Sequence, residues 1–134
     1  MAHPTQRMDG GRLLRTRWLP VAAYVALIFT LSAQAGLTIP GTLKWRDKIV
    51  HTIEYGLLGG LVFRAARDTW PTVAVQRRVL ASALAVAAVG AIDERFQGSV
   101  PGRDSSVYDW YADATGATLS QFIGWALTRR RKGA

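Results

Sequence analysis

Cysteine is absent from the sequence, which excludes disulfide bonds, thiolate metal sites and cysteine nucleophiles. Acidic residues are scarce, since nine Asp and Glu stand against 17 Lys and Arg and leave a formal net charge of +8. This surplus does not predict nucleic-acid binding, because the basic residues lie in separate flanking groups and not on one basic face studded with aromatic residues. With 134 residues, the chain is expected to form one domain.

Hydrophobic residues make up 49% of the chain and fall into four blocks. Residues 18–37 contain no charge and, at about 1.5 Å per helical residue, are long enough to cross the hydrocarbon core of a membrane. The later blocks are residues 47–66, 79–97 and 107–127. The block from 79 to 97 reaches the required length only if its helix continues through the charged residues near its end. We therefore predict an all-α fold, a bundle of four transmembrane helices over residues 18–128.

Basic residues flank the four blocks unequally. Twelve of the 17 Lys and Arg fall on one side of the predicted topology, with four in residues 1–17, four at positions 64, 67, 77 and 78, and four in residues 129–134. The other five fall on the opposite side, at positions 44, 46, 48, 95 and 103. Cytoplasmic segments are the richer in Lys and Arg, so both termini are predicted to be cytoplasmic, with a flexible basic tail at residues 1–17 and a basic tail at 129–134. Basic residues, an apolar run and the small residues Ala33 and Ala35 are also typical of a cleaved signal peptide, and cleavage would remove the first helix.

Most acidic residues lie in two stretches that this topology places at the outer face. Seven of the nine do so: Asp47, Glu54, Asp93, Glu94, Asp104, Asp109 and Asp113. Charges near a bilayer cost several kcal/mol unless they are paired or hydrated, so these groups predict a functional site. At about 100° per residue, Asp47, His51 and Glu54 share one face of the second helix. His51 with Glu54 is then either a general base or metal ligand, or an interhelical hydrogen bond that fixes packing.

The same stretches contain candidate groups for binding cations and anions. No ligand-spacing motif such as HExxH is present, but four carboxylates could hold a divalent cation together with His51: Asp93, Glu94, Asp109 and Asp113. The alternative is that these carboxylates pair with Arg95 and Arg103. Arg103 follows a Pro-Gly pair and is the best candidate for binding phosphate, because a guanidinium matches phosphate geometry. Its alternative role is an ion pair with Glu94 or Asp109.

Small residues mark the expected contacts between helices. Glycine and serine recur along two of the helices and predict close packing, and they also permit self-association: Gly56, Gly59 and Gly60 in the second helix, and Gly116, Ser120 and Gly124 in the fourth. Pro101 and Gly102 lie in the break between the third and fourth helices. Ser105 or Ser106 is expected to cap the fourth helix, with Asp109 as the acidic member of a capping box.

One combination of spaced residues resembles the VanZ-like family of small bacterial membrane proteins. It consists of Asp47-Lys48 with His51 and Tyr55, Asp93-Glu94 with Gln97, Pro101-Gly102-Arg103, and Asp109 with Gly116. The similarity covers residues 18–126, but the family usually has asparagine at position 113 and glycine at position 120. The resemblance implies four transmembrane helices, a bacterial inner-membrane location, and an association with the cell envelope and with resistance to teicoplanin-type glycopeptide antibiotics. It names no reaction.

Together these residues predict a multi-pass membrane protein that recognises or modifies an anionic lipid, or a lipid-linked cell-wall precursor, by its headgroup at the outer leaflet. The candidate acid, base or metal-binding groups are His51, Glu54, Glu94 and Asp109. The candidate ligand-binding groups are Asp47, Lys48, Asp93, Gln97, Arg103 and Asp113. Whether the protein is an enzyme stays open. The alternatives are a non-enzymatic accessory protein that binds lipid or partner proteins, and a subunit of a proton-coupled transporter.

Overall fold

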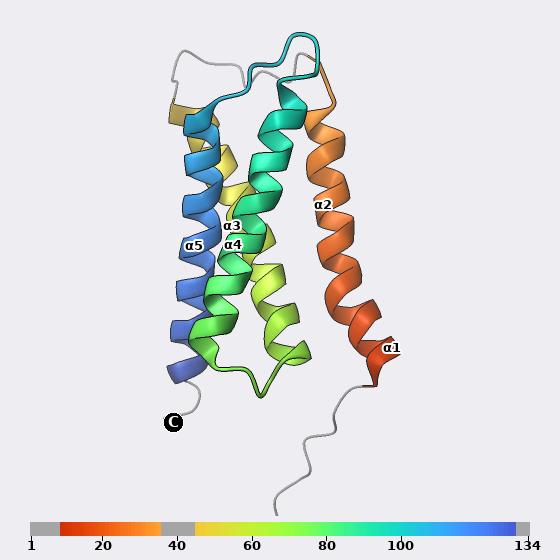
Figure 1. Cartoon of the computed structure of the whole chain (residues 1–134), viewed down its shortest axis with the longest axis vertical. Coiled ribbons are helices and arrows are strands. Elements are labelled where there is room, and N and C mark those ends of the chain that lie inside the picture. Colours follow the sequence, from red (N-terminus) through yellow and green to blue (C-terminus); the bar gives the residue numbers. More distant parts are fainter. Residues whose placement is uncertain (1–8, 36–44, 131–134) are drawn as a thin grey trace, which may run out of the picture.

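The computed structural model describes residues 9–35 and 45–130, and every regular element within these two ranges is helical (Figure 1). The N-terminal helix consists of three consecutive elements: α1 Gly10–Leu13, a π-helical turn η1 Leu14–Trp18, and α2 Leu19–Ser32. Three longer helices follow: α3 Trp45–Thr69, α4 Val75–Gln97 and α5 Val107–Arg130. The predicted all-α fold is confirmed, and α4 continues to Gln97 as expected.

The N-terminal helix begins earlier than the sequence indicated. Gly10 and the residues after it are helical, although they were expected to belong to a flexible tail. Asp9 caps this helix, since its carboxylate accepts a hydrogen bond from the backbone N–H of Arg12 at 2.7 Å. At the other terminus, α5 extends to Arg130. The rest of the two predicted tails lies outside the described residues.

The π-helical turn has a local cause in the sequence. It comes directly before Pro20, which has no N–H to donate to the carbonyl of Thr16 four residues earlier and whose ring crowds that carbonyl. Arg64 of α3 donates a hydrogen bond to the Thr16 carbonyl instead, at 3.3 Å. The distortion therefore releases a backbone acceptor that links the N-terminal helix to α3.

Helices α3 and α5 pack most closely, α4 lies against both, and α2 lies along the edge formed by α3 and α4 (Figure 1). The buried apolar residues form one cluster: Val21, Ile28, Tyr55, Leu58, Val62, Ala65, Val86 and Ala117. Only three residues of α2 are buried, namely Val21, Ile28 and Ser32. The three helices α3, α4 and α5 thus form the core of the bundle, and α2 covers one side of it.

The contact between α3 and α5 depends on small residues, as the sequence predicted. A methyl group added at Gly116 would collide with the backbone carbonyl of Thr52, and one added at Gly59 would collide with the Ser120 side chain. The prediction is wrong for Gly60, because a methyl group there would meet nothing within 4 Å. Close approach of the two backbones is therefore set by particular glycines and not by all of them.

Two helical stretches are long and apolar enough to cross a membrane, Gly10–Ser32 and Val75–Gln97, each of 23 residues. In the most apolar 18-residue part of each stretch, only 11% and 17% of the residues are buried inside the structure. Most of their apolar surface therefore faces outward. Helices α3 and α5 have similar lengths of 25 and 24 residues but are not among these two stretches. Both still expose large apolar side chains, among them Ile53 and Leu57 on α3 and Phe122 and Ile123 on α5. This distribution is consistent with a membrane protein.

The two ends of the bundle carry opposite kinds of charge. Basic residues gather where the N-terminal helix begins, where α3 connects to α4 and where α5 ends (Figure 1): Arg12, Arg15, Arg17, Arg64, Arg67, Arg77, Arg78, Arg129 and Arg130. Acidic residues gather at the opposite end, where α3 and α5 begin and α4 stops: Asp47, Glu54, Asp93, Glu94, Asp104, Asp109 and Asp113. We call this second end the acidic end.

Side chains at the basic end fasten the N-terminal helix to α3. Arg17 forms an ion pair with Asp68 at 2.5 Å, and the indole N–H of Trp18 donates to the Thr69 hydroxyl at 2.8 Å. The Trp18 ring also contacts Trp70 edge-on, with 5.7 Å between the ring centroids. Because α2 itself buries only three residues, these contacts help to hold the whole N-terminal helix against α3.

We expect Trp18→Ala to destabilise the protein by about 2 kcal/mol, since it removes a half-buried ring and a hydrogen bond. Thermal unfolding of the purified protein in detergent measures the effect. Leu19→Ala is the matched control, because Leu19 is 59% exposed and should be replaced with little loss. Equal losses in both variants would show that Trp18 does not anchor the helix.

Candidate functional site

The acidic end contains all ten side chains that the sequence singled out for catalysis or ligand binding. Helix α3 contributes Asp47, Lys48, His51 and Glu54, α4 contributes Asp93, Glu94 and Gln97, α5 contributes Asp109 and Asp113, and the connection between α4 and α5 contributes Arg103. They meet because α4 runs antiparallel to α3 and α5, so the end of one helix lies beside the beginnings of the other two (Figure 1). Nine of these ten side chains make hydrogen bonds or ion pairs with one another or lie within 4.0 Å of such a partner.

His51 lies at the centre of an inner cluster. Its Nδ1 atom is 2.8 Å from Asp113 Oδ1 on α5 and 4.0 Å from Glu94 Oε1 on α4. All three side chains are buried, with exposed fractions of 7% for His51, 5% for Glu94 and 0% for Asp113. The structure thus gives the imidazole an interhelical hydrogen bond, one of the two roles expected for it, and the partner is Asp113 on α5.

Lys48 forms an outer cluster with two carboxylates. Its ammonium group pairs with Asp109 and lies 3.5 Å from Asp47 Oδ2. The other ring nitrogen of His51, Nε2, is 4.0 Å from Asp47 Oδ1, so the imidazole lies between the outer and inner clusters. Asp47 is half exposed whereas Asp109 is buried. Asp47 is therefore the member of this outer cluster that is most accessible from the surface.

A second chain of hydrogen bonds runs from the core to the surface. The Tyr55 hydroxyl donates to Asp93 Oδ2 at 3.2 Å, and the Gln97 amide donates to the same oxygen at 2.9 Å. Arg103 then donates to the side-chain carbonyl of Gln97 at 2.8 Å. The Gln97 amide also lies 3.3 Å from the hydroxyl of Ser32, which brings the end of α2 into the site. Ser32 follows an apolar run, and no pattern in the sequence indicated that it would lie in the site.

Glu94 also accepts a hydrogen bond at the beginning of α5, where the sequence predicted a role for Asp109. Ser106 caps α5 as expected, since its hydroxyl accepts from the backbone N–H of Tyr108 at 3.2 Å. The expected capping box with Asp109 is wrong, because Asp109 pairs with Lys48 and the Ser106 N–H donates to Glu94 Oε2 at 2.9 Å. Glu94 therefore joins the end of α4 to the beginning of α5.

Two further residues depart from the sequence interpretation. Glu54 is half-buried on α3 and forms no hydrogen bond or ion pair with any described residue. Gly90 on α4 was not singled out, yet a methyl group there would meet Asp113 Oδ2 at 3.0 Å and the Tyr55 ring at 3.3 Å. Glycine at position 90 thus leaves the space in which Asp113 can approach His51, and only a three-dimensional arrangement could reveal this.

Three carboxylate oxygens in the site are buried without a hydrogen-bond partner: Asp93 Oδ1, Glu94 Oε1 and Asp113 Oδ2. A buried acceptor that loses its water and gains no partner is costly, by about 1 to 3 kcal/mol. Among the hydrogen bonds and ion pairs described above, Lys48 and Arg103 are the lysine and arginine that contact the other candidate residues. The site therefore has an excess of negative groups, and it fits chemistry that involves a cation, a proton or both.

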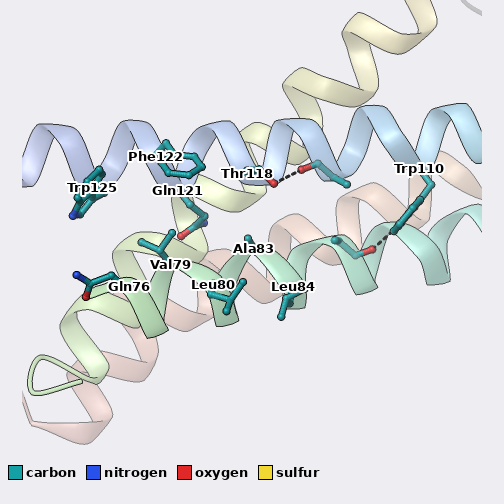
Figure 2. Close-up of a pocket in the computed structure, with 12 residues that line it drawn as sticks. Gln76, Val79, Leu80, Ala83, Leu84, Trp110, Thr118, Gln121, Phe122 and Trp125 are labelled. Atoms are coloured by element: carbon teal, nitrogen blue, oxygen red, sulfur yellow. Dashed lines mark hydrogen bonds between the residues drawn. The ribbon is translucent and has the colours of Figure 1, made fainter. Parts of the chain in front are cut away.

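A cavity lies elsewhere, on the side of the bundle between α4 and α5. It has a volume of about 540 Å³ and is lined mainly by apolar side chains, with Trp110 near one end and Trp125 near the other (Figure 2). Trp110 is held by a hydrogen bond from its indole N–H to the Ala87 carbonyl at 2.9 Å. None of the ten candidate residues lines this cavity.

Comparisons with protein-family models, with curated proteins and with solved structures found no match to this chain. The resemblance to the VanZ-like family therefore stays a prediction from the spaced residues. The class that the fold and the site define is an all-α bundle with a buried cluster of acidic groups at one end.

Proposed function

We propose that this chain is a four-span protein of a bacterial inner membrane, with both termini in the cytoplasm, and that its acidic end recognises an anionic headgroup at the outer leaflet. The opposite charges of the two ends support this orientation, because the cytoplasmic side of a membrane protein is enriched in Lys and Arg. The apolar side chains exposed on α3 and α5 support spans for these helices as well.

The observation that carries headgroup binding is the environment of Arg103. Its hydrogen bond goes to Gln97, which is neutral, and not to Glu94 or Asp109. All nine acidic residues of the chain lie in the described ranges, and none of them forms an ion pair with Arg103. An arginine carries several N–H donors beyond the one used here, so the rest of the guanidinium is available to a phosphate or carboxylate.

The connection between α4 and α5 is shaped to present this side chain. The Arg103 N–H donates to the Val100 carbonyl at 3.1 Å and closes a turn with Pro101 and Gly102 at its centre. Gly102 has φ of +81°, the conformation that the third position of a type II turn requires and that glycine adopts without strain. Arg103 is therefore held on a defined turn above the buried clusters.

Modification of the bound headgroup is the further step of this proposal. His51, Glu94 and Asp109 are buried near one another and can serve as acid, base or metal-binding groups in chemistry on a phosphate ester. The VanZ-like resemblance favours a cell-envelope lipid or a lipid-linked cell-wall precursor as the ligand, and a contribution to teicoplanin-type resistance. Turnover of prenyl phosphates or phospholipids by the purified protein in bilayers is the test of this step.

Binding itself is tested with Arg103→Ala in nanodiscs. We expect the affinity for a soluble short-chain prenyl phosphate to fall by about tenfold, because charge-assisted hydrogen bonds to the phosphate are lost. Arg95→Ala is the matched control, since Arg95 is an exposed arginine at the same end and its removal changes the net charge equally. If both variants lost the same affinity, net charge alone would explain the effect. That result would overturn the proposal.

A further inference from the structure

We infer that His51, Glu94 and Asp113 bind a divalent transition-metal ion, with Zn²⁺ or Mn²⁺ preferred over Mg²⁺ and Ca²⁺. This inference rests on the proposed function and names the group that completes its site. One ligand atom from each of the three residues lies within 4.8 Å of the other two, and all three residues are buried. The three come from α3, α4 and α5, so the ion would join the three core helices.

The spacing of the ligand atoms suits a metal ion. Metal–ligand distances of about 2.0 to 2.2 Å in a tetrahedral site place neighbouring ligand atoms roughly 3.3 Å apart. The separations from His51 Nδ1 are 2.8 Å to Asp113 Oδ1 and 4.0 Å to Glu94 Oε1, which lie on either side of that value. Small rotations of the side chains would bring all three atoms to one ion.

Unpartnered oxygens provide independent support. Glu94 Oε1 and Asp113 Oδ2 accept no hydrogen bond, although Glu94 is 5% exposed and Asp113 is fully buried. None of the ion pairs in the described part of the chain joins either carboxylate to a lysine or an arginine. A bound cation would take Glu94 Oε1 as a ligand and offset the charge of both carboxylates, whereas the one hydrogen bond from His51 reaches only Asp113 Oδ1.

Of the two clusters, the inner one is the better metal site, because the outer one already contains a positive side chain. Asp47, His51 and Asp109 are also close enough to hold an ion, but the ammonium group of Lys48 already pairs with both of these carboxylates. The outer cluster therefore has a cation of its own. Asp47 Oδ1 lies 4.0 Å from His51 Nε2, so a carboxylate faces the ring nitrogen that would carry the proton when Nδ1 binds metal.

The donor set selects the metal. Mg²⁺ and Ca²⁺ prefer oxygen ligands alone, whereas an imidazole with two carboxylates suits Zn²⁺ or Mn²⁺. Three protein ligands leave a coordination position open, as in zinc sites that act on substrates. That position would accept water or an oxygen of the headgroup phosphate, so the ion and Arg103 would provide two positive groups for one anion.

The test is metal binding by the full-length protein in detergent, with no lipid added. After treatment with chelator, we expect one equivalent of Zn²⁺ to bind in calorimetry, and the affinity to fall by at least about tenfold in His51→Ala, Glu94→Gln and Asp113→Asn. Asp104→Asn and His3→Ala are the controls, since Asp104 is an exposed carboxylate and His3 is the only other histidine of the chain. Their affinities should change by less than about twofold.

A second measurement does not depend on whether the variants fold. X-ray absorption of the Zn²⁺-loaded wild-type protein should show one imidazole nitrogen among oxygen ligands. No binding by the wild-type protein, equal affinity in Glu94→Gln, or a spectrum without imidazole would each overturn the metal site. Headgroup binding that depends on Arg103 but needs no metal would leave the proposed function intact, whereas Zn²⁺ binding without headgroup binding would leave only the metal site.

Discussion

In intact cells, Asp104→Cys should react fully with a membrane-impermeant maleimide, whereas Thr72→Cys should react only after the membrane is permeabilised. Residues 104 and 72 are both exposed and lie in the connections at opposite ends of the bundle. If the basic end is cytoplasmic, as the distribution of Lys and Arg predicts, only residue 104 is reached from outside. The effect is close to all-or-none, which makes orientation the most decisive property to measure.

The chain is well suited to this measurement because it contains no cysteine, so the labelled thiol is the introduced one. Both variants should react completely in detergent, which controls for the accessibility of each thiol. The reverse pattern would place Arg103 and the acidic end in the cytoplasm and would contradict headgroup recognition at the outer leaflet. Labelling of both thiols in intact cells would contradict a bundle that spans the membrane.

The helices and the gathering of the acidic groups could be predicted from the sequence because both depend on local patterns. Apolar runs separated by turn residues locate α3, α4 and α5, and short connections make neighbouring helices antiparallel. Charged residues that cluster at the end of one helix and the beginning of the next must then meet. Asp93 and Asp109 are brought to the same end of the bundle for this reason alone.

The pairing of individual side chains could not be predicted in the same way. Which carboxylate of another helix His51 meets depends on how far α3 and α5 are rotated and on their relative height, and neither follows from the periodicity of one helix. Arg103 met the neutral Gln97 and not a carboxylate for the same reason. The early start of the N-terminal helix was missed because its first turns lack an apolar face, although Asp9 provides a recognisable cap.

Gly116→Ala should be the most destabilising of the conservative glycine substitutions in the bundle. A methyl group at this position would meet the Thr52 carbonyl and would lie 2.9 Å from the backbone nitrogen of Gly56. Both are backbone atoms, so the clash cannot be relieved by rotating a side chain and α3 must move away from α5. We expect a loss of about 3 kcal/mol and, for a chain of this size, a melting temperature lower by roughly 10 °C in detergent.

The controls for this prediction lie in the same pair of helices. A methyl group at Gly56 would be in ordinary contact with Gly116, at 3.7 Å from its carbonyl oxygen, and one at Gly60 would meet nothing. Because alanine favours helix more than glycine does, Gly56→Ala and Gly60→Ala should preserve stability or raise it slightly.

Gly116 is also one turn beyond Asp113, and Thr52 follows His51, so separation of the helices at this level should lengthen the hydrogen bond between His51 and Asp113. Loss of stability in Gly116→Ala should therefore be accompanied by weaker Zn²⁺ binding, and a stable Gly116→Ala variant would contradict the close contact of α3 and α5 on which the site depends.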